Sequence, residues 1–335
     1  MRNSPSKATV NPSVSDFEKV QIKTPLKVFN RSSQWYLARR SVLRYWQLYL
    51  LMLPALFYFL VFKYVPMANA VIAFKEYNVL KGIWGSDWVG LKYFLLFFQN
   101  PVFWTLLKNT LGLSLYSLVV GFPIPIILAV FLNEIRDGAF KRSVQLVTYA
   151  PYFISTVVMV SMVILMLAPR LGVINLVFQT LGQAPVNFLG RPNLFPAIYV
   201  WSGIWQFSGY SAIVYLAALA GVDPQLYEAA KMDGASRIQK IFYIDLPGIM
   251  PVIVIILILN VGTLLGIGFE KVYLLQNPLN LAASEIIATY VYKVGLLNAN
   301  YSFATAVGLF NSVINMILLV MVNSFAKRVS DTSLW

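Results

Sequence analysis

The chain has 335 residues, of which 59% are hydrophobic and 12% are charged, with a formal net charge of +13. Soluble proteins carry about a quarter charged residues, so this composition excludes a soluble protein, and the absence of cysteine and histidine excludes disulfides, thiolate chemistry and the most common metal ligand and general base. The apolar residues form blocks of roughly twenty residues with almost no charge, the length at which a helix crosses a bilayer. They predict an all-α polytopic membrane protein.

Six apolar blocks are long enough to cross a membrane as helices. In chain order they are Trp46–Pro66, Leu107–Leu132, Leu146–Pro169, Phe195–Ala220, Gly248–Gly268 and Phe303–Ala326. We expect the prolines to kink these helices, and the candidates are Pro54, Pro123, Pro125 and Pro151. The sequence thus predicts a six-helix transmembrane domain over residues 46–326, with a basic tail over residues 1–45 and a short tail over residues 327–335.

The distribution of Lys and Arg predicts which side of the membrane each loop occupies. In the six-helix arrangement both termini lie on one face, and this face holds 17 of the 26 Lys and Arg residues. Arg39, Arg40 and Arg44 come directly before the first apolar block. We therefore expect a membrane protein with both termini in the cytosol. We expect the basic charge to meet anionic membrane lipid and not nucleic acid, because no folded basic domain is visible.

The apolar blocks lack the groups that proton-coupled or voltage-gated proteins place at membrane depth. Their interiors hold essentially no Asp, Glu, Lys or Arg. The chain also has no G-x-x-x-x-G-K-[ST] phosphate-binding loop and no Gly-Lys dipeptide, so it cannot bind ATP through that motif. We therefore expect no enzyme chemistry and no bound cofactor or metal in this chain, and if it takes part in active transport, the energy must come from a partner protein.

Neutral hydrogen-bonding and aromatic side chains lie inside the apolar blocks instead. An unpaired amide in hydrocarbon costs several kcal/mol, so each must face another helix or a water-filled path. One interpretation is hydrogen bonding between helices, and the other is a path for an uncharged or hydroxyl-rich solute. Asn311 and Asn315 are four residues apart and so share a helix face. The candidate path residues are Asn109, Tyr116, Trp205, Gln206, Tyr210, Asn260, Asn311 and Asn315.

The longest inner loop between blocks, Gly221–Pro247, predicts two short helices joined by a turn. Asp223 before Pro224 is a typical helix start. Gly234 permits the left-handed conformation that ends a helix, and Ser236 with a Gln three residues later forms a capping box for the second helix. We expect this helix pair to lie along the inner membrane surface with one face free for a cytosolic protein.

The same loop resembles the coupling loop of permease subunits of binding-protein-dependent ABC importers, which has the form E-A-A-x3-G-x9-I-x-L-P. The matching positions are Glu228, Ala229, Ala230, Gly234, Ile244, Leu246 and Pro247. The resemblance covers residues 46–326 and implies a type I ABC importer permease with the MetI-like fold. It implies that Ala229 and Ala230 permit close approach to a groove of the ATPase and that Gly234 lets the chain turn. The implied ATPase-coupling residues are Glu228, Ala229, Ala230, Asp233, Gly234 and Ala235.

The resemblance also implies the partners of this chain. They are a second six-helix permease, a dimer of ABC ATPase subunits on the cytosolic face and an extracellular solute-binding lipoprotein. Closure of the ATPase dimer would pull the coupling loop and switch the helices between inward-open and outward-open states. No covalent chemistry would take place in this chain.

Other segments resemble carbohydrate-uptake permeases, and more narrowly the LplB-like branch that imports polysaccharide fragments. These segments are YLLMLPALFYFLVFKYVPM at Tyr49–Met67, WVGLKYF at Trp88–Phe94, GFPIPIILAVFLNEI at Gly121–Ile135, FEKVYLLQNPL at Phe269–Leu279 and TYVYKVGL at Thr289–Leu296. The resemblance implies a sugar substrate, an oligosaccharide or polysaccharide fragment. Cations in the predicted outer loops would favour an acidic sugar or an acidic docking surface equally.

Two other classes of protein compete with this interpretation. A self-contained channel or secondary transporter for a polar solute is expected to show ionisable groups at membrane depth, or inverted repeats with broken helices, and the sequence displays neither. A membrane enzyme or a sensor subunit is the third class. The missing His and Cys and the absence of a carboxylate pair inside the apolar blocks argue against the enzyme.

Overall fold

The computed structural model describes residues 44–330, and almost all of them are helical. The predicted basic tail therefore lies outside the described residues except for its last two positions, and residues 331–335 of the predicted C-terminal tail lie outside them as well. The chain divides into two compact units, residues 1–67 and 68–335. Each unit is described by itself.

The first unit contains the first predicted membrane helix. It begins with α2 (Trp46–Phe59), continues through the π-helical turn η2 (Leu60–Tyr64) and passes into α3 (Val65–Ala68). No side chain from Trp46 to Phe59 is buried within this unit. Because these side chains are almost all apolar, this helix must be covered by lipid or by protein.

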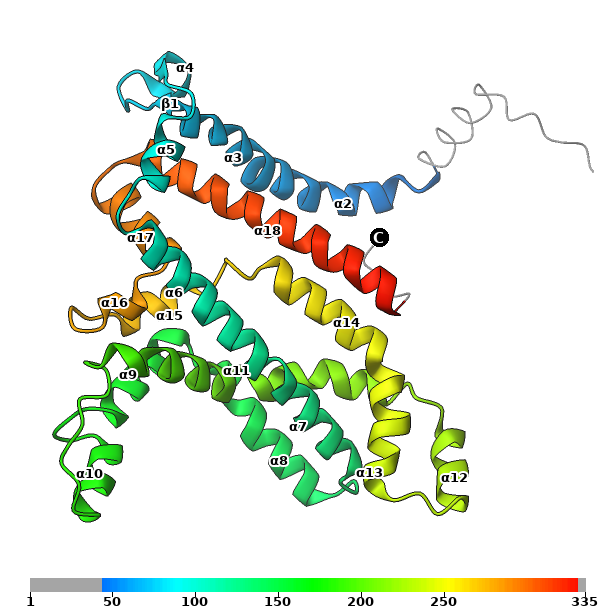
Figure 1. The fold of residues 1–335 in the computed structure, drawn as a ribbon. Helices are drawn as coiled ribbons and strands as arrows, with labels where there is room; N and C mark the ends of the chain where they lie inside the picture. The colour runs from blue at the N-terminus through cyan, green and yellow to red at the C-terminus, as the bar shows by residue number, and fades with distance from the viewer. Residues whose placement is uncertain (1–43, 331–335) are drawn as a thin grey trace, which may run out of the picture. The chain divides into compact units, whose positions relative to one another are not determined.

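The second unit holds the remaining elements (Figure 1). Its first part contains η3 (Asn69–Phe74), β1 (Lys75–Glu76), α4 (Gly82–Gly85), β2 (Asp87–Trp88), α5 (Lys92–Phe98), α6 (Phe103–Tyr116), η4 (Ser117–Gly121), α7 (Pro123–Glu134), α8 (Ala139–Tyr149), η5 (Ala150–Phe153), α9 (Thr156–Met166) and α10 (Val173–Thr180). The strands β1 and β2 pair antiparallel, with Lys75 opposite Trp88 and Glu76 opposite Asp87. They form a small hairpin outside the helical region.

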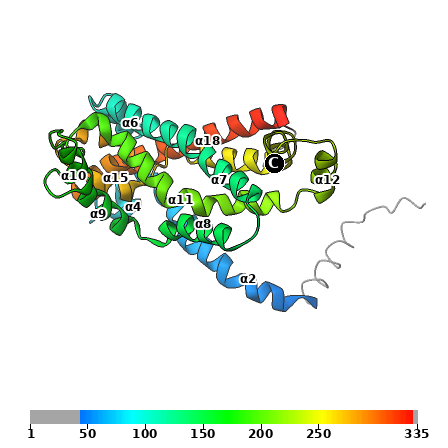
Figure 2. The same ribbon diagram turned by 90° about the horizontal axis from the view of Figure 1, so that it is seen from below.

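The later part of this unit starts with a long central helix. Its elements are η6 (Pro192–Leu194), α11 (Phe195–Leu219), α12 (Pro224–Met232), α13 (Arg237–Lys240), η7 (Ile241–Asp245), α14 (Leu246–Gly262), α15 (Phe269–Leu275), α16 (Leu281–Ser284), α17 (Ile287–Tyr292), η8 (Lys293–Leu297) and α18 (Tyr301–Ser330). Figures 1 and 2 show α9 and α10 at one end of α11 and α12 at the other end.

Three π-helical turns stand in the same relation to a proline. The turns η2, η4 and η7 end two residues before Pro66, Pro123 and Pro247, respectively. A proline inside a helix has no N–H to donate and its ring crowds the carbonyl one turn earlier. A π turn rearranges the hydrogen bonds at that point without ending the helix, so these helices continue through their prolines.

Within residues 44–330, four helices are long and apolar enough to cross a membrane, and a bent pair, counted as one span, raises the number to five. The four are Trp46–Phe74, Phe103–Glu134, Arg237–Gly262 and Tyr301–Arg328. They correspond to the first, second, fifth and sixth predicted blocks. The fourth block forms α11, which has 25 residues but carries serines, tyrosines and a glutamine along its length and is not among the four.

The prediction of one continuous third helix is wrong. This region forms α8 with η5, followed by α9, and the two parts meet at an angle of 102°. Pro151 interrupts the helical hydrogen bonds, and Ser155 starts α9 as an N-cap that accepts a hydrogen bond from the amide of Val158. The sequence analysis took the lack of broken helices as an argument against a secondary transporter. The break in the third block removes that part of the argument.

Two further expectations need correction in the fifth helix. The predicted second short helix of the inner loop is not separate, because α13, η7 and α14 form one helix over Arg237–Gly262. This helix also ends at Gly262 and not at Gly268. The following residues, 263–268, are non-helical up to the start of α15. Glycines at positions 262, 266 and 268 weaken the helix there.

The second unit has three buried apolar clusters along its helices. The first joins α5, α6, α17 and α18, the second joins α6, α9, α11 and α15, and the third joins α7, α11 and α14. The helix α11 also approaches α8 closely, because a Cβ atom built on Gly209 would lie 1.9 Å from the carbonyl oxygen of Thr148. This contact requires a glycine on α11.

Substitution of Gly209 by Ala is therefore expected to separate α11 from α8. Overpacking of this kind costs about 1–3 kcal/mol, so the melting temperature of the purified protein in detergent should fall. Gly112→Ala is the matched control, since Gly112 is also helical and a Cβ there meets nothing within 4 Å. An unchanged melting temperature for Gly209→Ala would contradict the close approach.

Candidate functional site

The non-helical segment of residues 263–268 is held by side chains of two other helices. Asn315 of α18 accepts a hydrogen bond from the amide of Leu265 at 3.0 Å, and Asn311 donates to the Leu265 carbonyl at 3.3 Å. Ser114 of α6 donates to the carbonyl of Leu264. Backbone groups that leave a helix at membrane depth need such partners. Asn311 and Asn315 share one face of α18, as predicted.

This segment lines one side of a cavity of about 640 Å³. Parts of α6, η4, α7, α11 and α14 form the other sides. The polar lining comes from Ser114, Ser117, Tyr210, Ser211, Asn260 and Thr263. Non-helical backbone within a membrane protein is tolerated where it is buried in protein or lines a water-filled cavity. The volume falls within the range of small-molecule sites, about 300–1,000 Å³.

A second cavity of about 310 Å³ adjoins the first. The two share the lining residues Ser117, Gly121, Pro125, Ser211 and Asn260. The second cavity continues along α11 toward Tyr199 and is lined at that end by Lys271 of α15. The positions from Tyr199 to Ser211 cover about 18 Å of helix at 1.5 Å per residue. We refer to the two cavities together as the polar cavity.

Lys271 lies between the fifth and sixth predicted apolar blocks, a region that the sequence predicts to be a loop. Only 6% of its surface is exposed, and its ammonium donates to the carbonyl of Tyr199 at 2.7 Å. Burial lowers the pKa of Lys271 to about 7. No regular spacing in the sequence distinguishes this lysine from the exposed cations of the same region, because its burial depends on how α15 packs against α11.

The predicted path residues lie in different places. Tyr210 and Asn260 line the polar cavity, whereas Asn311 and Asn315 hold the non-helical segment. The other predicted path residues lie outside the lining of the two cavities. Tyr116 accepts a hydrogen bond from the indole of Trp201 at 3.2 Å, and Trp205 is 48% exposed.

Gln206 and Asn109 make hydrogen bonds to backbone carbonyls. Buried Gln206 donates to the carbonyl of Ile154 at the break between η5 and α9, at 2.9 Å. Asn109 donates to the carbonyls of Ala282 and Glu285, both at 3.0 Å. Gln206 thus binds the backbone at a helix break, as Asn311 and Asn315 do, whereas Asn109 binds the backbone in α16 and just after it.

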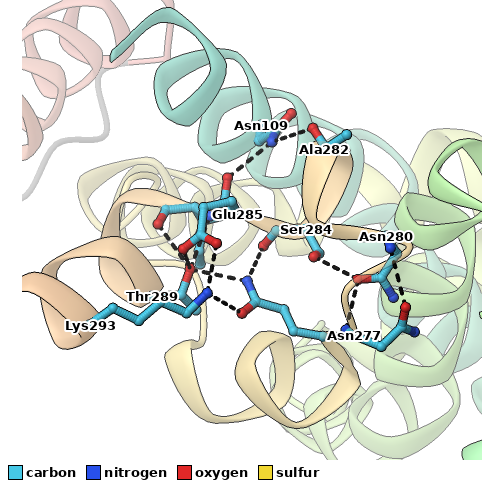
Figure 3. A network of polar contacts seen from close by, with 10 residues as sticks. Asn109, Asn277, Asn280, Ala282, Ser284, Glu285, Thr289 and Lys293 are labelled. Carbon is cyan, nitrogen blue, oxygen red and sulfur yellow. Dashed lines mark hydrogen bonds and ion pairs between the residues drawn. The ribbon is translucent and has the colours of Figure 1, made fainter. Parts of the chain in front are cut away.

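Asn109 belongs to a larger polar network, shown in Figure 3. Lys293 pairs with Glu285 at 2.7 Å and donates to Gln276 at 3.1 Å. Asn280 accepts from Ser284 at 2.8 Å. The network ties the short helices after α15 to α6, so hydrogen bonds fix the region that follows Lys271.

The inner loop has the helix ends that the sequence predicts. Asp223 caps α12 by accepting from the amide of Gln225 at 2.9 Å. Gly234 has a φ angle of +72°. The amide of Ala235 donates to the carbonyl of Ala230, and that of Gly234 to Lys231, which is the Schellman arrangement at a helix end.

The capping box at the start of α13 is also formed. Ser236 and Gln239 exchange hydrogen bonds at 2.8 and 3.3 Å. The two helices of the loop are therefore separated by a defined turn at Gly234.

Three contacts fix this loop to the helices beside it. Tyr227 of α12 donates a hydrogen bond to buried Asp245 at 2.5 Å. Burial raises the pKa of the Tyr227 hydroxyl, and the bond to Asp245 raises it further. Lys240 of α13 pairs with Glu134 at the end of α7 at 3.4 Å.

The third contact is steric. A Cβ atom on Gly248 would lie 2.8 Å from Val222, so the start of α14 and the start of the loop touch. Tyr227 and Val222 thus connect α12 to the helix that contains α14, and Lys240 connects the same helix to α7.

The predicted coupling residues project from the other side of this turn. Glu228, Ala229, Asp233 and Gly234 are exposed, and Ala230 and Ala235 are half-buried. Met232 beside them is 87% exposed. A helix end with small residues and an exposed methionine presents a surface on which another protein can pack closely. Among residues 44–330, no group of three or more Asp or Glu side chains is arranged to hold a metal ion.

Comparison with known proteins gives close relatives over most of the chain. The polygalacturonan/rhamnogalacturonan transport system permease protein YteP of Bacillus subtilis (strain 168) is 47% identical over 288 residues, which cover 86% of this chain and 90% of YteP. Protein LplB of the same organism is 44% identical over 288 residues, which cover 86% of this chain and 91% of LplB.

A solved structure has a similar fold. A chain of a bacterial ABC transporter involved in the import of the acidic polysaccharide alginate has a TM-score of 0.82 and 38% identity, covering 88% of this chain and 99% of that one. The expected MetI-like all-α fold, the resemblance to the LplB-like branch and the expectation of a transport subunit in place of an enzyme are confirmed. A family model matches residues 121–331, and the chain belongs to this family, the binding-protein-dependent transport system inner membrane component.

Proposed function

We propose that this chain is one permease subunit of an ATP-driven importer and forms half of the path for an oligosaccharide or polysaccharide fragment. Its partners are a second permease, two ABC ATPase subunits that bind ATP and Mg²⁺, and an extracellular solute-binding lipoprotein. The observation that carries the proposal is the Glu228–Gly234 turn, which presents small exposed residues at one end of the helix that reaches the polar cavity. Family membership supports the class, and the names of the relatives support the sugar.

The polar cavity suits a sugar in its chemistry. Its hydroxyl and amide groups, with Ser117, Ser211 and Asn260 at the centre, can exchange hydrogen bonds with sugar hydroxyls. Tyr210 at its edge stacks on Tyr152, with ring centroids 3.7 Å apart. An aromatic pair of this kind offers an apolar face to the C–H side of a sugar ring. The solute would move along α11 between the two permeases.

The topology completes this proposal. With 25 residues, α11 is about 37 Å long at 1.5 Å per residue, which is sufficient to cross the hydrocarbon core. We count it as one more span, which brings the number to six, and attribute Ser208, Tyr210 and Ser211, which line the polar cavity, to the path. The bent pair of α8 and α9 is then the third span. This count gives the cytosolic termini and the cytosolic coupling turn that the Lys and Arg distribution predicts, in a bacterial cell membrane.

The helix Arg237–Gly262 provides a mechanical link between the turn and the cavity. Its first residue follows the capping box at Ser236, and its last residue precedes the non-helical segment. Closure of the ATPase dimer would displace α12, and the contacts of Tyr227 and Lys240 would pass this movement to α14 and α7. The non-helical segment, which has no helix of its own to resist bending, would change the shape of the cavity.

Gly234→Asp is expected to abolish ATP-driven uptake while the protein still inserts into the membrane. An aspartate is strained at a φ angle of +72° and adds a charge beside Asp233 in the docking surface. Uptake into proteoliposomes and recovery of the ATPase in pull-downs measure the effect. Gly182→Asp is the control, because Gly182 has a φ angle of +74° and equally open surroundings but lies outside the loop. Full uptake by Gly234→Asp would contradict the coupling role.

Tyr227→Phe should weaken the link between the coupling loop and the helices. It removes the hydroxyl bound to Asp245, whose second oxygen already has no hydrogen-bond partner in the described residues. Loss of a partner by a buried polar group costs about 1–3 kcal/mol. The melting temperature and the amount of solute imported per ATP hydrolysed should both fall. Tyr243→Phe, at a residue that is 79% exposed, should change neither. Equal behaviour of the two variants would contradict the link.

A further inference from the structure

Lys271 is a buried cation without a carboxylate partner among the described residues. The ion pairs within residues 44–330 join other cations, namely Lys81, Lys92, Lys141, Lys240 and Lys293. The neighbouring Glu270 points outward, since it is exposed while Lys271 is 6% exposed. A buried ammonium without a counter-ion is costly, and such groups are rarely retained for stability alone.

The surroundings of the ammonium are arranged to hold it in place while leaving it incompletely bonded. Its nitrogen lies 4.7 Å from the centre of the Tyr199 ring, a cation–π contact. It donates to the Tyr199 carbonyl at 2.7 Å. Gly203, one turn further along α11, leaves the space that the nitrogen occupies, because a Cβ there would lie 2.9 Å away. Of the three N–H donors of the ammonium, one has a hydrogen-bond partner.

The remaining donors have a place to act, because Lys271 lines the smaller part of the polar cavity. Gly203, Ser208 and Ser211 of α11 line the same part, and Ser117 and Asn260 connect it to the larger part. Hydroxyl and amide groups thus lie along the cavity, with a single cation at the end away from the coupling loop. This pattern is complementary to a molecule with many hydroxyls and a carboxylate.

We propose that Lys271 binds the carboxylate of an acidic sugar unit in the polar cavity and selects acidic over neutral oligosaccharides. The proposal rests on the proposed function and names the substrate class of the same site. A carboxylate that enters the cavity would accept the free N–H donors and neutralise the buried charge. The hydroxyls of the same sugar would meet the serines and Asn260. A permanent Asp or Glu partner would compete with the solute.

The test uses the complete transporter, with its binding protein, in proteoliposomes loaded with ATP. Trigalacturonate is the acidic probe, and its methyl triester is the neutral probe of the same ring structure. Uptake of each probe by Lys271→Met is divided by its uptake by the unmodified chain. The preference of the binding protein cancels in this ratio. Since a hydrogen bond to a charged group is strong, we expect uptake of trigalacturonate to fall by about tenfold or more and uptake of the ester to fall by less than about twofold.

Two controls separate selection from damage to the fold. Lys108→Met removes an exposed cation from α6 and should change neither ratio. The melting temperature of the Lys271→Met complex should be equal to or above that of the unmodified complex, because the substitution removes an unpaired buried charge. Gly203→Ala, which keeps the lysine but crowds its nitrogen, should also reduce trigalacturonate uptake more than ester uptake.

Each outcome decides the proposal. Equal losses of both probes, or undiminished uptake of trigalacturonate, would overturn it. If the unmodified chain imports trigalacturonate but not its ester, the melting temperature decides. Loss of trigalacturonate uptake by Lys271→Met together with a lower melting temperature would overturn the proposal. The same loss with an unchanged or higher melting temperature would support it. ATP-driven uptake of the neutral probe alone by the unmodified chain would refute the inference and leave the proposed function standing. No ATP-driven uptake of either sugar or of other oligosaccharides would refute the proposed function.

Discussion

The need to satisfy backbone hydrogen bonds away from water constrains this structure more than any other interaction. Most of the chain meets this need by being helical. Where the backbone leaves the helical conformation, amide and hydroxyl side chains replace the missing partners. Asn311, Asn315 and Ser114 do so for residues 264 and 265, and Gln206 does so at the end of η5. The non-helical segment can therefore line a cavity without losing its structure.

The coupling turn and the polar cavity lie at the two ends of one helix. Arg237–Gly262 begins beside the turn at Gly234 and ends at the non-helical segment. At the first end, Lys240 pairs with Glu134 and Tyr227 donates to Asp245. At the second end the helix gives way to the non-helical segment, which Asn311, Asn315 and Ser114 hold. Under the proposed function, this arrangement would let the helices respond to ATP hydrolysis in a partner protein. It also explains why buried Lys271 has no permanent counter-ion, if its partner is the transported solute.

Much of this structure was predictable from local sequence patterns. The cap at Asp223, the turn at Gly234 and the capping box at Ser236 follow from short-range chemistry, and all three are formed. The first, second, fifth and sixth apolar blocks form long apolar helices in the predicted order, because hydropathy is a local property. The family was accessible because the coupling loop combines a fixed spacing with a fixed position between apolar blocks.

The rest depends on contacts between distant segments. Pro151 and Ser155 mark the break at Ile154 and three glycines weaken the end of α14, but the amides that stabilise both places, Gln206, Asn311 and Asn315, come from distant helices. The burial of Lys271 likewise depends on packing against α11, which no window of sequence displays. For the same reason, an asparagine in an apolar block does not reveal whether it faces a cavity, as Asn260 does, or a backbone carbonyl, as Asn109 does.

The most direct test of the central claim is to purify this chain from native membranes in mild detergent and to identify the bound proteins by mass spectrometry. The account predicts recovery of a second permease and an ATPase, and solute flux in liposomes only when the ATPase and ATP are present. Recovery of the chain alone, with solute flux in liposomes that lack any ATPase, would contradict it and identify a self-contained transporter.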